Sequence, residues 1–136
     1  VFLDGTVIGR FGDPQAMQFK TVSLAPGRHV LAVQTARQNY PDWLQVALKY
    51  KNRITGTDGS WKFSFNQENN WTSADFNDSS WESLTYWVKG PPEEPYIFCA
   101  PNEHPGMQSV PWGIRPAKDW PANARLVFYR KVFTVE

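Results

Sequence analysis

Aromatic side chains flanked by polar ones are the residues of this chain best suited to chemistry. The face of a Trp or Tyr ring stacks on the apolar C–H side of a sugar, and neighbouring amide or guanidinium groups hydrogen-bond to its hydroxyls. Such groups make a site when loops carry them on a rigid sheet. The alternative is that these aromatics only pack the loops onto the sheet. The sequence predicts a carbohydrate site whose ligand-binding residues are Trp112, Trp120, Trp71, Trp87, Tyr96, Asn70 and Arg115.

Catalytic groups are poorly matched to any reaction. Neither His29 nor His104 has a Cys, His or Asp at metal-ligand spacing, and His29 precedes a predicted strand, where a structural role is expected. A glycosidase needs two carboxylates facing each other across a cleft. The nearest pairs, Glu93-Glu94 and Asp75 with Asp78, lie in turn-forming segments. We therefore expect no catalysis by this chain, although it could belong to a larger glycoside hydrolase.

Cysteine chemistry is limited to one residue. Because Cys99 is alone, an internal disulfide and a Cys-based metal site are excluded. The thiol is expected to be buried and inert, or else to bridge to another chain. No cofactor is expected.

Composition indicates one all-β domain from an extracellular or cell-surface protein. The chain has 136 residues, with seven Trp and eleven Pro. Its 14 Lys and Arg balance 13 Asp and Glu without a basic tract, so no nucleic-acid or membrane-surface partner is expected. No apolar run approaches the roughly 20 residues of a membrane span. Since the chain begins at Val1 without a signal peptide, we expect a processed product or a fragment.

Residues 1–50 are predicted to form a sheet with one buried face. Asp4-Gly5 lies between two apolar runs, which is the strongest short-range sign of a β-hairpin. Residues 18–24 are predicted as a strand, residues 25–27 (Ala-Pro-Gly) as a turn and residues 29–36 as another strand. Residues 43–50 alternate cleanly, and this strand is expected to turn one face inward with Leu44, Val46, Leu48 and Tyr50.

The middle of the chain is predicted to be richer in turns. Residues 51–60 carry Gly, Asp and Asn and mark a loop or a domain boundary. Residues 61–65 are predicted as a strand. Asn, Asp, Ser and Thr dominate residues 66–80 and favour turns, with at most a short helical turn near residues 73–76 or 79–83. Trp61 and Trp81 are expected in the core.

The C-terminal third combines a long loop with a strong strand. Residues 90–121 carry eight prolines, which exclude a continuous helix or a central strand and predict a long ordered loop. Residues 125–135 are predicted as a strand, with a β-bulge where Arg130-Lys131 breaks the alternation. No helix longer than about one turn is supported. The predicted class is all-β.

Four segments resemble motifs of galactose-binding-like domains. Phe76-Asn-Asp-Ser-Ser-Trp81 resembles the F-D-D-S-x-W signature, and Tyr129-Arg-Lys-Val-Phe-Thr-Val135 is similar to the strand F-R-K-x-F-x-V. The segment Val1–Gly9 resembles the hairpin V-x-V-N-G-x-x-V-G, and Leu24–Val33 resembles L-x-P-G-x-N-x-L-A-V. Together these segments cover most of the chain.

This resemblance implies a fold, a setting and a metal. The family members are antiparallel jelly-roll β-sandwiches that accompany bacterial β-galactosidases, β-glucuronidases and α-rhamnosidases. Residues 1–136 would then form one such sandwich. Many relatives hold a structural calcium ion through carboxylates and backbone carbonyls. Asp58, Asp75 and Asp78 could contribute here, although no run of alternating acids marks a metal site.

The motif halves stand in swapped order, because the family has its signature and R-K-x-F strand before the hairpin. One explanation is a chain that straddles two tandem domains, with a boundary in residues 51–60. A circular permutation is the second, since domain termini often lie close together. The third is a fragment completed by strand exchange with a copy or a neighbouring domain, because about twenty residues of family strand have no counterpart and would leave an edge unpaired.

The expected function is a non-catalytic, lectin-like carbohydrate-binding module with a glycan or polysaccharide as partner. One alternative is an accessory domain that supports a large glycoside hydrolase without touching sugar. The other is an adhesive or matrix domain that assembles with itself as a homo-oligomer.

Overall fold

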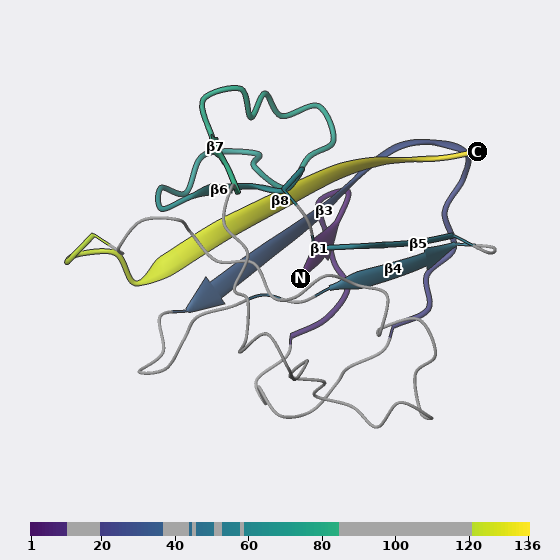
Figure 1. Cartoon of the computed structure of the whole chain (residues 1–136), viewed down its shortest axis with the longest axis horizontal. Coiled ribbons are helices and arrows are strands. Elements are labelled where there is room, and N and C mark those ends of the chain that lie inside the picture. The colour runs from purple at the N-terminus through teal and green to yellow at the C-terminus, as the bar shows by residue number, and fades with distance from the viewer. Residues whose placement is uncertain (11–19, 37–43, 45, 51–52, 58, 85–120) are drawn as a thin grey trace, which may run out of the picture.

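The computed structural model describes residues 1–10, 20–36, 44, 46–50, 53–57, 59–84 and 121–136, with the backbone alone at residues 53–55. Within this part the chain is all-β and antiparallel, as predicted. One sheet has six strands in the order β2-β1-β3-β8-β6-β7, and β4 and β5 form a two-stranded sheet (Figure 1). These residues contain no helix, and so none that is long and apolar enough to cross a membrane. The strands are β1 (Phe2–Leu3), β2 (Thr6–Val7), β3 (Gly27–Ala36), β4 (Ala47–Tyr50), β5 (Arg53–Gly56), β6 (Lys62–Ser64), β7 (Glu82–Ser83) and β8 (Leu126–Val135).

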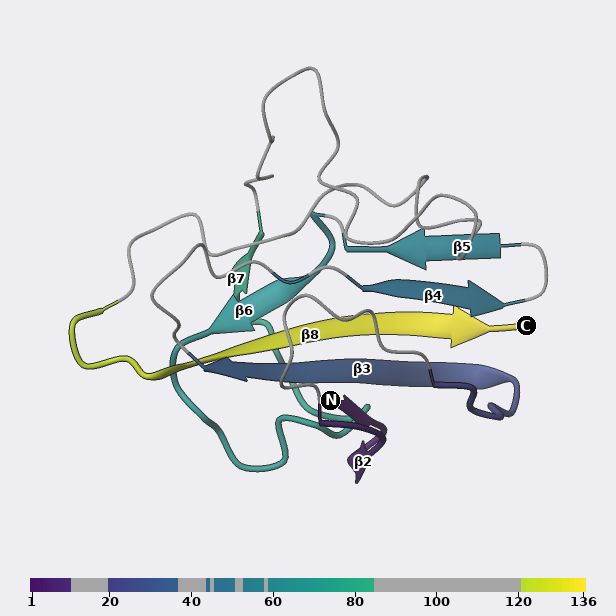
Figure 2. The same ribbon diagram turned by 90° about the horizontal axis from the view of Figure 1, so that it is seen from below.

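The two long strands, β3 and β8, form the centre of the six-stranded sheet. They pair antiparallel without interruption, from Gly27 opposite Val135 to Ala36 opposite Leu126 (Figure 2). Both contain several β-branched residues, which pack well on a pleated surface. The strands predicted at residues 29–36 and 125–135 are thus confirmed. Their pairing brings the N-terminal and C-terminal motif halves into one sheet.

The predicted bulge in β8 is wrong. Arg130 lies opposite Ala32 and Lys131 opposite Leu31, so the ladder runs straight through the two cations. Both faces of β8 are covered, and consecutive side chains alternate between them. Tyr129 joins a buried cluster on one face, while Phe128 joins a second cluster on the other. The adjacent cations therefore reflect one basic side chain on each face.

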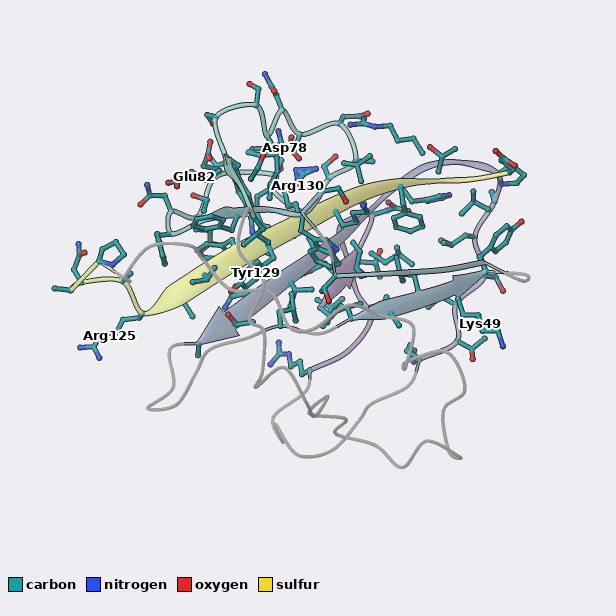
Figure 3. All side chains as sticks on the ribbon, viewed as in Figure 1. Lys49, Asp78, Glu82, Arg125, Tyr129 and Arg130 are labelled. Carbon is teal, nitrogen blue, oxygen red and sulfur yellow. The ribbon has the colours of Figure 1, made fainter. Side chains whose placement is uncertain are left out.

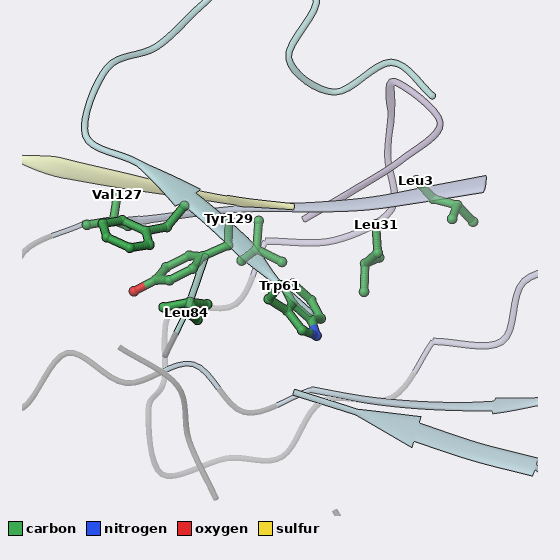
Figure 4. Close-up of a cluster of buried hydrophobic side chains, with 8 residues drawn as sticks. Leu3, Leu31, Trp61, Leu84, Val127 and Tyr129 are labelled. Atoms are coloured by element: carbon green, nitrogen blue, oxygen red, sulfur yellow. The ribbon is translucent and has the colours of Figure 1, made fainter. Parts of the chain in front are cut away.

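The first core cluster lies between the six-stranded sheet and the β4–β5 hairpin (Figure 4). The Trp61 indole donates a hydrogen bond from Nε1 to the Gly56 carbonyl oxygen at 3.2 Å, which ties this cluster to the end of β5. Leu44, Val46 and Leu48 pack against the cluster, as their alternation predicts, but Tyr50 is 38% exposed. The buried members are Leu3, Leu31, Val33, Trp61, Phe63, Leu84, Val127 and Tyr129.

The second core cluster covers the opposite face of the sheet and consists of Ala32, Trp71, Trp81 and Phe128. The Trp71 ring lies 5.0 Å from the Phe128 ring and 6.2 Å from the Trp81 ring, measured between centroids. Its indoles come from residues 66–81, which form turns as predicted and contain no helical turn. The core positions predicted for Trp61 and Trp81 are confirmed, with exposures of 1% and 5%.

Two segments differ from their predicted structure. Residues 20–25, the described part of the predicted strand 18–24 and the residues after it, form no strand, and Lys20 to Ser23 are exposed. No described strand runs beside them, and β propensity does not hold a strand that lacks a partner. Residues 53–56, predicted as loop, form β5 opposite β4. The register places Thr55 opposite Leu48 and Ile54 opposite Lys49.

A buried guanidinium joins β8 to the turn that resembles the family signature. Arg130 is 1% exposed, and its guanidinium carbon lies 4.7 Å from the Phe76 ring centroid. Arg130 Nη2 donates to the Ser73 carbonyl oxygen at 3.0 Å, and Nε lies 3.5 Å from Asp78 Oδ2 (Figure 3). Asp78 also accepts from Lys62 Nζ through Oδ1 at 2.9 Å. Burial lowers the pKa of Arg130, and the Asp78 charge opposes this.

The β1–β2 hairpin is held to β3 by a second polar contact. Asp4 and Gly5 have φ values of 48° and 83°, which fit the type I′ turn expected of an Asp-Gly pair. His29 Nδ1 donates to Asp4 Oδ2 at 2.6 Å, and Nε2 donates to the Ala25 carbonyl oxygen at 2.8 Å. Both acceptors favour the doubly protonated ring. The Asp4 hydrogen bond, followed by that to Ala25, raises the pKa of His29. The structural role expected of His29 is confirmed.

We expect Asp78→Asn to lower the free energy of unfolding by about 2–4 kcal/mol, because it leaves the buried Arg130 charge without a counterion. Arg130→Met should be less harmful, since it leaves no uncompensated buried charge. Urea unfolding measures both effects. Asp75→Asn, an exposed carboxylate in the same loop, is the matched control and should stay within about 0.5 kcal/mol of the parent. Equal effects of Asp78→Asn and Asp75→Asn would contradict this role.

Stability should also depend on pH through His29. Because the folded pKa is raised, the stabilisation is complete below the unfolded value of about 6.5 and is lost as the pH rises through the folded value. We therefore expect the Tm difference between the parent and His29→Gln to shrink between about pH 5.5 and about pH 8.5. A Tm difference that stays constant over this interval would show that the ring acts by packing on Phe133 alone.

Candidate functional site

A cleft of about 590 Å³ opens at the end of β6, beside β7 and the start of β8. We call it the β6–β8 cleft. Its lining combines the rings of Phe65 and Trp81 with polar side chains. Its polar lining residues include Ser64, Asn66, Gln67, Glu82, Asn123 and Arg125.

A tight turn after β6 shapes one wall of the cleft. The Ser64 hydroxyl accepts a hydrogen bond from the Asn66 backbone N–H at 3.0 Å and donates to the Asn66 carbonyl oxygen at 3.1 Å. This local bonding stops β6 and turns the chain. The Phe65 ring meets the Phe63 ring edge-on at 5.7 Å between centroids. The turn thereby fixes Asn66 and Gln67 at the rim, with their amide groups making no hydrogen bond among the described residues.

The opposite wall comes from the residues that lead into β8. The Ala124 backbone N–H donates to the Pro121 carbonyl oxygen at 2.9 Å, which closes a turn just before the strand. Asn123 lies in this turn, and Arg125 directly precedes β8. Both side chains are exposed, and neither makes an ion pair or a hydrogen bond within the described part of the chain. The turn thus places two polar side chains that have no partner among the described residues at this wall.

Trp81 connects the cleft to the core. Its indole belongs to the second core cluster and is 5% exposed, and its Nε1 donates to Glu68 Oε1 at 2.6 Å. The Phe76 ring contacts it edge-on at 5.7 Å between centroids. Trp81 therefore contributes a fixed wall and little open ring surface.

The described lining of the cleft carries one charge of each sign and several neutral polar groups. Among the described lining residues, Glu82 is the one carboxylate and Arg125 the one cation. No second carboxylate faces Glu82 from this lining, and a glycosidase requires two. Amides and hydroxyls supply the remaining polar groups, which donate and accept hydrogen bonds without moving a proton.

Most of the predicted ligand-binding residues lie outside the described part of the chain. These are Trp87, Tyr96, Trp112, Arg115 and Trp120. Asn70 is exposed in a turn at a φ of 59°, but it does not line the β6–β8 cleft. Trp71 is 4% exposed in the second core cluster, so its ring offers almost no surface to a sugar. The described site thus consists of residues that the sequence did not indicate.

A sequence signal for the cleft residues was present but weak. Asn66 and Gln67 directly follow the predicted strand 61–65, and Arg125 opens the predicted strand 125–135. All three residues lie at the end of a predicted strand, and binding residues are often found in the loops that begin or end there. The pairing of β6 with β8, which places the two ends together, was not visible in the sequence.

The metal prediction finds no ligand set in the described structure. Those residues contain no group of three or more His, Cys, Asp or Glu side chains placed to hold an ion. Of the suggested calcium ligands, Asp58 lies outside the described residues. Asp75 is exposed, and the carboxylate of Asp78 faces two cations, Lys62 and Arg130, which compete with a metal ion for it. Cys99, His104 and Glu93-Glu94 also lie outside the described residues.

Comparison with models of protein families, with curated protein sequences and with solved structures gave no match.

Substitutions at two neighbouring residues distinguish a polar side chain that stabilises the fold from one that has no partner among the described residues. Glu68→Ala removes the acceptor of the Trp81 indole and should lower the free energy of unfolding by about 1–2 kcal/mol. Gln67→Ala should change it by less than about 0.5 kcal/mol, because its amide has no described partner. Chemical unfolding of both variants checks this. A large loss in Gln67→Ala would mean that the rim amides hold the fold together.

Proposed function

We propose that the chain is a non-catalytic, lectin-like carbohydrate-binding module of a secreted or cell-surface protein, with the β6–β8 cleft as its binding site. The observation that carries this proposal is the set of amide groups on Gln67, Asn66 and Asn123, which have no partner among the described residues and line a cleft together with Phe65 and Trp81. Sugars present hydroxyls that need both donors and acceptors, and a side-chain amide offers both.

The size and rigidity of the cleft support a small ligand. Its volume of about 590 Å³ falls within the usual range of small-molecule sites. Both walls are tied to strands of the six-stranded sheet, so binding would cost little backbone entropy, and the entropic cost would fall on the exposed side chains that contact the ligand. A mono- or oligosaccharide end is the ligand that fits this description.

We further propose a galactose-binding-like jelly roll as the complete fold. The support is that three of the four motifs form paired elements of one sheet: the Val1–Gly9 motif gives the β1–β2 hairpin, and the other two lie in β3 and β8. The fourth, Phe76–Trp81, packs on Arg130 of β8. A single domain over residues 1–136 with permuted strand order agrees with this arrangement better than two tandem domains do.

The predicted aromatics outside the described residues remain part of the proposal. Trp120 is joined directly to Pro121, which lines the cleft. Trp87, Tyr96, Trp112 and Arg115 belong to the segment that leaves the described structure at Leu84 and returns at Pro121. Sugar stacking by these four residues and by Trp120 stays a prediction from the sequence.

A structural accessory domain of a glycoside hydrolase is the second candidate. It is favoured by the burial of Trp71 and Trp81, because both of these loop indoles serve packing. Under that reading the rim amides would be ordinary surface groups, and no glycan would bind.

A glycan array should show binding that the cleft amides control. Each lost hydrogen bond is worth about 0.5–1.5 kcal/mol, so the double variant with Gln67→Ala and Asn123→Ala should bind about 10-fold to 100-fold more weakly. Isothermal titration calorimetry with the best array ligand measures this. Gln34→Ala, an exposed glutamine of β3 outside the cleft lining, is the matched control and should bind normally. Folded protein that binds nothing on the array would favour the accessory domain instead.

A further inference from the structure

Arg125 differs from the other described cations around β6 and β8. Lys62 and Arg130 face Asp78, Arg28 donates to the Ala74 carbonyl oxygen, and Lys131 donates to the Ser60 hydroxyl. Arg125 lines the β6–β8 cleft, is exposed, and has no partner among the described residues. The backbone at Arg125 is nevertheless held in place, because the next residue, Leu126, pairs with Ala36 of β3.

We propose that the ligand of the β6–β8 cleft is an acidic sugar, and that Arg125 binds its carboxylate. This inference rests on the proposed function and names its ligand class. A guanidinium presents two parallel N–H groups that match the two oxygens of a carboxylate, which gives a charge-assisted, oriented pair. The rim amides then bind the hydroxyls of the same uronic acid.

The position of Glu82 limits where the ligand's charge lies. Glu82 also lines the cleft and already has an interaction of its own. Figure 3 shows it at β7, apart from Arg125 at the start of β8. A second negative charge near Glu82 would be repelled, so the carboxylate lies at the Arg125 end and a neutral part of the sugar faces β7. The cleft is thus selective for the placement of one charge, which distinguishes it from a general basic patch.

The test compares the methyl glycoside of galacturonic acid, which carries a single carboxylate, with the same sugar after methyl esterification of that carboxylate. We expect the acid to bind the parent protein about 10-fold or more tightly than the ester, since hydrogen bonds to a charged group are worth more than neutral ones. Added salt should reduce the difference. Calorimetric titration at two ionic strengths measures both quantities.

Three variants assign the preference to Arg125. Arg125→Gln should bind the acid and the ester equally, while Arg125→Lys should keep part of the preference because it retains the charge but loses the fork. Arg10→Gln removes the same charge at an exposed residue outside the cleft lining and should behave like the parent. Unchanged unfolding midpoints will show that the variants are folded.

Two results would overturn the inference without touching the proposed function. One is equal affinity of the parent for acid and ester, together with amide-dependent binding of a neutral glycan. The other is an acid preference that survives Arg125→Gln. Failure to bind any glycan would overturn both the inference and the proposed function.

Discussion

The uninterrupted pairing of β3 with β8 is the constraint from which the remaining described structure follows. Because β8 lies between β3 and β6, both of its edges are paired over Phe128–Arg130. Leu44, Val46 and Leu48 pack on one face of this part of the sheet and the indoles of residues 66–81 on the other, so both faces are buried there as well. A strand enclosed on four sides has one register, since a slip by one residue would exchange its two faces.

That enclosure explains why a charged residue in β8 shapes the loop above it. Arg130 cannot reach water from its place in the strand, and its charge is balanced only if an anion comes to it. Asp78 meets this need and, through Lys62, ties the turn to β6 as well. The segment Phe76–Trp81 is therefore held against the sheet by the ion pairs of Asp78 with β6 and β8. The polar side chains of the β6–β8 cleft lie at the other end of this contact, where β6 stops and β8 begins.

Local rules were sufficient for some elements. Asp4-Gly5 alone specified a hairpin, because only residues that tolerate positive φ fit its turn, and the apolar alternation of residues 44–48 predicted which side chains face the core. The same rules failed where strand pairing determined the local structure. Residues 20–24 have strand-like composition but no neighbouring strand among the described residues. Arg130-Lys131 broke a one-sided pattern that never applied to a strand buried on both faces.

The candidate site was the part least visible in the sequence, because its two walls are about sixty residues apart along the chain and meet only through the β6–β8 ladder. Sequence reasoning favoured indoles for binding, yet an indole serves equally well in a core, and burial chose the core for Trp71. The sequence by itself determined the all-β class, the turns and the apolar faces, since these depend on neighbours along the chain. Only the tertiary structure decided which polar groups have no partner in the described part of the chain, because that depends on the side chains that pack around them.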